Sequence, residues 1–240
     1  MITKKRRLGV RYSLSLITFL TSLILSYSIG EIFYNSIDGT DFYRYFRYIE
    51  YFMGEIETPT REQGLFYFWI ISIFIKSSQN FYISENWEFI YSTAIQLGNF
   101  VFYLVGIFGL IYLLRSRKVP WEKIFLVLSV LNFFPPLFGG RLIMKPEILA
   151  FAFLPWIILA IDNYLEKQNY FSLIYVSLLL SIIATSKGTV ALITFVSLGI
   201  LYFTKINLFK IKNIVIPGFV FLLSFYFLYS ENVSVNTISF

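Results

Sequence analysis

Seven long stretches of this sequence are rich in Leu, Ile, Val and Phe and carry no charged residue in their interior. About 20 apolar residues in a helix cross the roughly 30 Å hydrocarbon core of a bilayer. The whole chain of 240 residues is 57% hydrophobic and only 14% charged, which is more apolar than a soluble domain. We therefore predict an all-α integral membrane protein, one domain over residues 1–240, with about seven transmembrane helices. The predicted spans are about 12–30, 89–114, 124–140, 147–162, 168–186, 188–204 and 213–230.

The residue types that the chain lacks exclude several kinds of chemistry. It contains no cysteine and no histidine, so disulfides, zinc sites of the usual kind and Ser-His-Asp catalysis are ruled out. The net charge is +6, but the basic residues flank apolar runs instead of lining a polar face. Membrane lipid is therefore an expected partner and nucleic acid is not. Any catalysis has to use carboxylates, Lys, Arg, Tyr or a hard cation.

The distribution of charge predicts the orientation of the chain. If seven spans alternate from a cytoplasmic N-terminus, the inside segments hold 13 basic and 3 acidic residues, and the outside segments hold 7 basic and 11 acidic residues. Cytoplasmic segments of membrane proteins carry an excess of Lys and Arg. We expect the N-terminus to be cytoplasmic and the location to be a bacterial inner membrane, although the endoplasmic reticulum fits the same pattern.

The first outside segment, residues 31–88, contains two shorter helical patterns. In residues 41–54, apolar side chains recur every three or four positions on one face and charged side chains take the other. In residues 65–76, only about a dozen apolar residues occur together, which is too short for a span. We predict that both are amphipathic helices lying in the membrane plane. The apolar face of the first consists of Phe42, Tyr45, Phe46, Ile49 and Met53.

Charged residues at the outer ends of the spans form the candidate site. Placing an ionisable group at membrane depth costs free energy, so such a group is taken to indicate a functional site unless another explanation is found. Any one of the cations is explained equally well as a side chain that snorkels to phosphate headgroups. Their convergence from separate segments on one face favours a functional site. The residues concerned are Asp41, Arg61, Arg141, Lys145, Glu147 and Lys187.

The first outside segment also carries a recognisable order of residue types. Asp41 is followed four positions later by Tyr45, then by Gly54, and then by the aromatic run REQGLFYFW from Arg61 to Trp69. Two shorter motifs follow between later spans. One is Arg141 with the Lys-Pro-Glu sequence at 145–147, and the other is the Ser-Lys-Gly sequence at 186–188.

Together these motifs resemble those of the C-type glycosyltransferases, over residues 1 to about 230. Members of this superfamily, such as protein O-mannosyltransferases and lipid A aminoarabinose transferases, are polytopic enzymes that take a sugar from a polyprenyl-phosphate carrier. The resemblance implies a module of seven spans and two in-plane helices. It also implies inverting transfer to an acceptor glycan, lipid or protein on the non-cytoplasmic face.

The resemblance further implies roles for individual residues. Asp41 is the expected catalytic base, and Glu147 the group that orients a cation or the acceptor. The remaining candidates are expected to bind substrate, with the cations on the phosphate of the donor. Some relatives employ a divalent cation such as Mg or Mn at these carboxylates, so we keep a metal as a possible cofactor. The substrate-binding candidates are Asp38, Tyr45, Arg61, Arg141, Lys145 and Lys187.

Three other classes of protein remain as alternatives. A transporter or flippase and an oligosaccharide polymerase would also be polytopic and basic inside, and a non-catalytic membrane subunit would need no site at all. Transporters are expected to show inverted repeats and charges near the midplane. The sequence shows no internal repeat, and its ionisable residues cluster at the outer ends. The enzyme is therefore our preferred interpretation.

Overall fold

The computed structural model describes residues 2–37, 42–57, 65–81, 86–202 and 212–229. All the regular secondary structure in these residues is helical, so the all-α prediction is confirmed for this part of the chain. Ten helices occur in it. They are α1 (Ile2–Phe33), α2 (Phe42–Met53), α3 (Phe66–Phe81), α4 (Trp87–Ser116), α5 (Trp121–Leu131), α6 (Pro135–Leu142), α7 (Ile148–Lys167), α8 (Tyr170–Ser186), α9 (Gly188–Tyr202) and α10 (Lys212–Tyr229).

Three of these helices are long and apolar enough to cross a membrane, namely α1 from Gly9 onward, α4 and α7. A fourth span is obtained if α5 and α6 are counted as one bent helix. Three further apolar helices, α8, α9 and part of α10 (Val215–Leu228), are shorter. The described chain is thus consistent with an integral membrane protein of at least three spans, and the total of seven stays a prediction.

Large apolar side chains point outward from many of these helices. Examples are Ile24 on α1, Val130 on α5, Ile200 on α9 and Leu222 on α10, each of which exposes about two thirds or more of its side chain. A soluble protein rarely exposes so much apolar surface. Lipid is the solvent that suits these faces.

The predicted third span, 124–140, is not one continuous helix. It consists of α5 and α6, which meet at an angle of 60° across residues 132–134. The cause is the Pro135-Pro136 pair, because proline has no N–H to donate and the residue before a proline disfavours the helical conformation. Phe134 accordingly has extended backbone angles, φ −65° and ψ 117°.

Polar contacts fix the break between α5 and α6. The Asn132 side chain donates a hydrogen bond to Ser22 Oγ of α1 (2.7 Å) and accepts one from the Tyr103 hydroxyl of α4 (2.7 Å). Asn132 is almost fully buried. The break is therefore held against two neighbouring helices.

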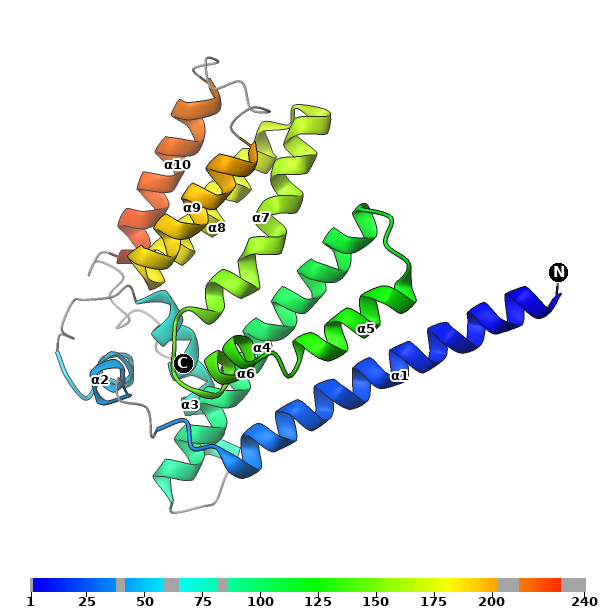
Figure 1. Ribbon diagram of the computed structural model, residues 1–240. Coiled ribbons are helices and arrows are strands. Elements are labelled where there is room, and N and C mark those ends of the chain that lie inside the picture. The colour runs from blue at the N-terminus through cyan, green and yellow to red at the C-terminus, as the bar shows by residue number, and fades with distance from the viewer. Residues whose placement is uncertain (1, 38–41, 58–64, 82–85, 203–211, 230–240) are drawn as a thin grey trace.

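Helix α4 lies at the centre of the bundle, between α7 on one side and α5 and α1 on the other (Figure 1). It approaches α7 closely at two glycines. A Cβ atom at Gly106 would lie 2.5 Å from the ring of Phe151, and one at Gly109 would lie 2.7 Å from Nε1 of Trp156. That same Nε1 donates a hydrogen bond to the Val105 carbonyl (3.0 Å). Small residues let membrane helices approach in this way.

Helix α2 packs on α3. Its buried residues are Phe42, Tyr45, Tyr48, Ile49 and Phe52, whereas the sequence predicted Phe46 and Met53 in place of Tyr48 and Phe52. The Phe68 ring of α3 stacks on Tyr48, with centroids 4.5 Å apart. The buried residues of α2 are therefore covered by protein.

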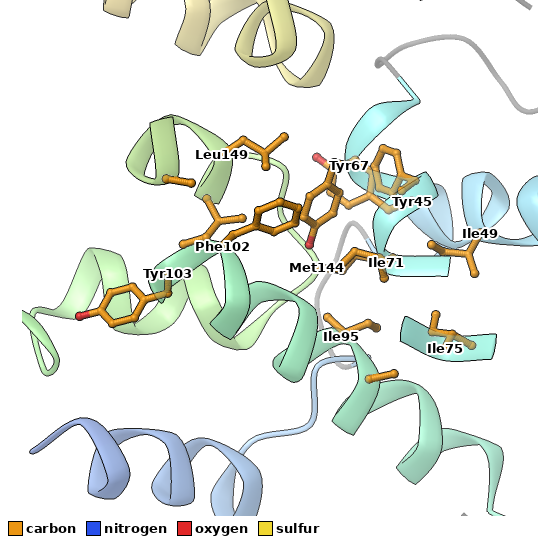
Figure 2. Close-up of a cluster of buried hydrophobic side chains, with 14 of the residues drawn as sticks. Tyr45, Ile49, Tyr67, Ile71, Ile75, Ile95, Phe102, Tyr103, Met144 and Leu149 are labelled. Carbon is orange, nitrogen blue, oxygen red and sulfur yellow. The ribbon is translucent and has the colours of Figure 1, made fainter. Parts of the chain in front are cut away.

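The core beneath α2 joins four helices. Figure 2 shows Ile49 of α2 and Tyr67, Ile71 and Ile75 of α3 facing side chains from α4 and α7. Helix α3 ends at Phe81, five residues beyond the predicted limit of residue 76. In Figure 1, α2 is seen nearly end-on while α4 and α7 run across the view, so α2 lies across the bundle. Whether α2 and α3 lie in the membrane plane stays a prediction.

The two ends of the bundle carry different segments. At one end, Arg117 after α4 forms an ion pair with Asp162 of α7 (2.6 Å), which also accepts a hydrogen bond from Tyr202 of α9 (3.0 Å). These residues lie in or beside the segments predicted to be cytoplasmic. Figure 1 shows α2 and α3 at the opposite end from the α4–α5 and α7–α8 turns. The separation of the two sets of segments agrees with alternating spans, while the cytoplasmic side stays a prediction.

Candidate functional site

The structure describes five of the eight predicted site residues: Tyr45, Arg141, Lys145, Glu147 and Lys187. The other three are Asp38, Asp41 and Arg61, and they lie outside the described residues. Asp41 directly precedes α2 in the sequence. The roles assigned to these three residues stay predictions.

Glu147 and Lys187 form the centre of the candidate site. The Lys187 ammonium group is ion-paired with Glu147 Oε1, although the two residues are 40 positions apart. Their side chains are 36% and 31% exposed, respectively. The structure thus brings together two of the predicted residues at a place that solvent or a ligand can reach.

Local backbone structure explains why Lys187 is available for this contact. It occupies the junction between α8 and α9, with extended angles of φ −157° and ψ 110°. Its N–H bonds to the Ile183 carbonyl at the end of α8, and its carbonyl accepts from the Ala191 N–H at the start of α9. Among the described residues, no atom outside its own helix and chain neighbours lies within 4 Å of the position of a Cβ on Gly188. The described part of the chain therefore leaves the junction open on the side of Gly188.

Glu147 is the N-cap residue of α7 and follows Pro146. Its side chain makes no capping bond to its own helix, so it is available to Lys187. Oε2 of Glu147 is buried and has no hydrogen-bond partner among the described residues. Buried polar atoms nearly always have such a partner, and leaving one without costs about 1–3 kcal/mol. This oxygen is an unused acceptor at the site.

Two helices begin at this ion pair. Helix α7 starts at Ile148, directly after Glu147, and α9 starts at Gly188, directly after Lys187. The N-terminal end of a helix carries a partial positive charge and N–H groups without intrahelical partners. Together with the Lys187 ammonium group, these ends favour a negatively charged group, which in the structure is the Glu147 carboxylate.

Tyr67 and Asn99 position the chain that leads to Glu147. The Tyr67 hydroxyl donates a hydrogen bond to Asn99 Oδ1 (2.7 Å). Asn99 Nδ2 in turn donates to the carbonyls of Arg141 (2.9 Å) and Ile143 (2.8 Å). This clamp ties the end of α6 and the non-helical segment before α7 to α3 and α4.

Tyr67 also lies close to the predicted site residues. Figure 2 shows it between Tyr45 and Phe102. Burial raises the pKa of Tyr67 well above its usual value, and the Glu147 carboxylate raises the same pKa further. At neutral pH Tyr67 is therefore a hydrogen-bond donor and not a base. Tyr45, which was predicted to bind substrate, is itself buried against Phe68, with ring centroids 5.4 Å apart.

The structure does not place Arg141 on the open face with Lys187. Only 2% of Arg141 is exposed. Its guanidinium donates to Ser26 Oγ (3.2 Å) and to the Ser26 carbonyl (2.8 Å), on α1. Three aromatic rings surround it, those of Phe100, Tyr103 and Phe138, with centroids 5.1–5.6 Å away. Arg141 therefore fixes α6 to α1 and α4, and an incoming phosphate does not reach it in this conformation.

Lys145 is half-buried and lies two residues before Glu147. Its backbone is within hydrogen-bonding reach of the Tyr67 hydroxyl. Lys145 thus belongs to the same clamped segment as Glu147. It remains a candidate for binding the donor phosphate.

Sequence reasoning missed three polar residues that the structure singles out: Tyr67, Asn99 and Glu31. Glu31 lies near the end of α1, where Oε2 accepts from Thr93 Oγ1 (3.3 Å) and Oε1 is buried without a partner among the described residues. Asn99 stands inside the uncharged run 89–114. Polar residues inside membrane spans are rare and usually hydrogen-bonded across helices, which is the signal that would have identified it.

The described residues contain no group of three or more Asp or Glu side chains arranged to hold a metal ion. The carboxylate at the candidate site, Glu147, is engaged by Lys187. The other two predicted acids, Asp38 and Asp41, lie outside the described residues. A site for Mg or Mn therefore stays a prediction.

Comparisons with protein-family models, with curated proteins and with solved structures find no match for this chain. The resemblance to C-type glycosyltransferases accordingly rests on the motifs of the sequence. The geometry adds a lysine and two helix N-termini suited to an anion, and a carboxylate oxygen suited to a hydrogen-bond donor.

Proposed function

We propose that this protein is a membrane glycosyltransferase of the inverting C-type. It would move a sugar from a polyprenyl-phosphate carrier to an acceptor on the non-cytoplasmic face. The observation that best supports this is the contact of Glu147 with Lys187, at which two helices begin. Such a transfer needs positive charge on the departing phosphate and a base for the acceptor.

In the proposed reaction, Lys187 and Lys145 hold the donor phosphate. The acceptor oxygen attacks the anomeric carbon from the face opposite the phosphate, and the bond from that carbon to the phosphate oxygen breaks with inversion. Asp41 takes the proton of the acceptor. Asp41 directly precedes α2 in the sequence, and α2 packs on α3 through Tyr48 and Phe68.

The proposal includes seven spans. Four come from α1, α4, the bent α5–α6 pair and α7, and three come from α8, α9 and α10. Helix α8 has 17 residues, which corresponds to a length of about 25 Å. A span somewhat shorter than the hydrocarbon core is accommodated by local thinning of the bilayer at modest cost.

The proposal is tested by measuring sugar transfer from polyprenyl-phosphate sugars in membranes that contain the full chain. Asp41→Asn and Lys187→Ala are each expected to lower the rate at least about 100-fold, because they remove the base and the charge on the leaving group. Lys123→Ala is the matched control, since Lys123 is exposed near the start of α5 at the opposite end. Wild-type rates in both site variants would end the assignment.

A further inference from the structure

We infer that the Glu147–Lys187 contact is the resting state of an anion-exchange site. In this inference a phosphate ester, that of a polyprenyl phosphate, displaces the Glu147 carboxylate from Lys187. The freed carboxylate then accepts a hydrogen bond from the hydroxyl of the acceptor. The inference rests on the proposed function for the identity of the anion, but the exchange itself is a binding property.

The first argument is that the protein already holds an anion at this position. Glu147 Oε1 contacts the Lys187 ammonium group, and the first turn of α9 begins at the next residue, Gly188. A phosphate monoester such as polyprenyl phosphate carries more negative charge than a carboxylate, and the phosphodiester of a sugar donor carries the same single charge but has more acceptor oxygens. Either group therefore suits a lysine beside helix N-termini better than the carboxylate does.

The second argument is access. The Lys187 side chain is 36% exposed, and the described residues leave the space beside Gly188 open. Partly exposed ion pairs are weak, so a stronger anion can replace one partner. Arg141 offers the contrast, because its guanidinium is enclosed by Ser26 and three rings and has no such opening.

The third argument comes from a comparison with the other ion pair in the described residues, Arg117–Asp162. Asp162 uses one oxygen for Arg117 and the other for the Tyr202 hydroxyl, so both of its oxygens are engaged. Glu147 uses one oxygen for Lys187, and its second oxygen is buried without a partner in that part of the chain. The paired state of Glu147 is therefore incompletely satisfied. If phosphate replaces Glu147 on Lys187, the freed Glu147 carboxylate can accept a hydrogen bond from the acceptor hydroxyl. That bond would remove the penalty of the unpartnered oxygen.

The inference predicts that removing the charge of Glu147 strengthens the binding of phosphate. Glu147→Gln removes one carboxylate that competes for Lys187, and it is expected to tighten phosphate binding roughly two- to fivefold, the contribution of a part-exposed ion pair. Lys187→Gln is expected to weaken binding at least about tenfold. In the double variant, the gain from Glu147→Gln should disappear, because the two side chains act on the same anion. If the pair is only structural, removing Glu147 would weaken binding or leave it unchanged.

The experiment measures binding of a short-chain polyprenyl phosphate, of inorganic phosphate and of phosphatidylglycerol to the purified full chain in detergent micelles. Glu147→Ser is a second variant that lacks the charge but keeps a residue preferred at a helix N-cap, in case Glu147→Gln fails to fold. Asp162→Asn is the control at the opposite end of the bundle. It should leave all three affinities unchanged.

Tighter binding of polyprenyl phosphate in both Glu147 variants supports the exchange. If inorganic phosphate binds more tightly as well, the site recognises the phosphate group alone. If it does not, the site also recognises the lipid chain. Tighter binding of phosphatidylglycerol alone, or unchanged or weaker binding of every anion, overturns the inference. A chain that shows the exchange but transfers no sugar refutes the proposed function only, and a chain that transfers sugar without the exchange refutes this inference only.

Discussion

Gly106 is the position where the packing of the bundle is most directly testable. A Cβ atom there would lie 2.5 and 2.6 Å from two ring carbons of Phe151 and 2.8 Å from the Phe151 carbonyl oxygen. The ring can rotate, but the carbonyl belongs to the backbone of α7. Gly106→Ala therefore forces α4 and α7 apart by about 1 Å, the shortfall from ordinary contacts near 3.5–4.0 Å.

The size of the effect follows from three contributions. Overpacking costs about 1–3 kcal/mol, and weakening of the Trp156–Val105 hydrogen bond costs about 0.5–1.5 kcal/mol. Alanine is a better helix former than glycine by roughly 0.5–1 kcal/mol, which offsets part of this cost. The net loss of unfolding free energy is about 2 kcal/mol, which corresponds to a fall of roughly 4–8 °C in Tm.

Gly199→Ala is the matched control. Gly199 lies inside α9, and no described residue beyond its own helix and chain neighbours comes within 4 Å of a Cβ there. This variant gains helix propensity without a clash, so its Tm should equal or exceed that of the wild type. The assay is thermal unfolding of the purified protein in detergent micelles, followed by helical circular dichroism. If Gly106→Ala is as stable as Gly199→Ala, the close approach of α4 and α7 is not real.

Three further predictions address other parts of the bundle. Asn132→Leu should lower unfolding stability by about 1–3 kcal/mol in the same assay, because it leaves the buried Tyr103 hydroxyl without its acceptor, while the Ser22 hydroxyl keeps its bond to the Phe19 carbonyl. Phe68→Ala should cost about 3–5 kcal/mol and make α2 sensitive to proteolysis, since it removes the ring on which α2 packs. The chain has no cysteine, so single cysteines report topology. With seven spans, Ser116→Cys and Lys167→Cys should react with an impermeant thiol reagent on one side of the membrane and Gly188→Cys on the other; labelling of all three from one side would show that α8 does not cross.

The positions of the helices could be predicted from the sequence because they depend on local composition. Apolar runs and their charged ends gave α4 and α8 to within a few residues. The break between α5 and α6 was also visible locally, as Pro135-Pro136, and was missed because the run was counted by length and charge alone. Hydrophobicity does not register a change of helix direction.

The surroundings of individual side chains were harder to predict. The buried face of α2 is turned toward Tyr48 and Phe52 because the ring that receives it, Phe68, lies on a different helix. Arg141 was grouped with Lys187 because both stand at the outer ends of spans. Its hydrogen-bond partner, Ser26, lies more than a hundred residues away in the sequence.

The contrast between Arg141 and Lys187 shows what a charge at membrane depth can mean. A guanidinium that is 2% exposed and bonded to Ser26 stabilises the arrangement of α1, α4 and α6, whatever the chain does. A lysine whose side chain is 36% exposed, and whose carboxylate partner retains an unused oxygen among the described residues, can exchange that partner for a ligand. Both residues are cations beside apolar runs, so the sequence treats them alike. Access to an incoming anion is therefore the property that separates a structural charge from a functional one, and it depends on which distant segments pack around each side chain.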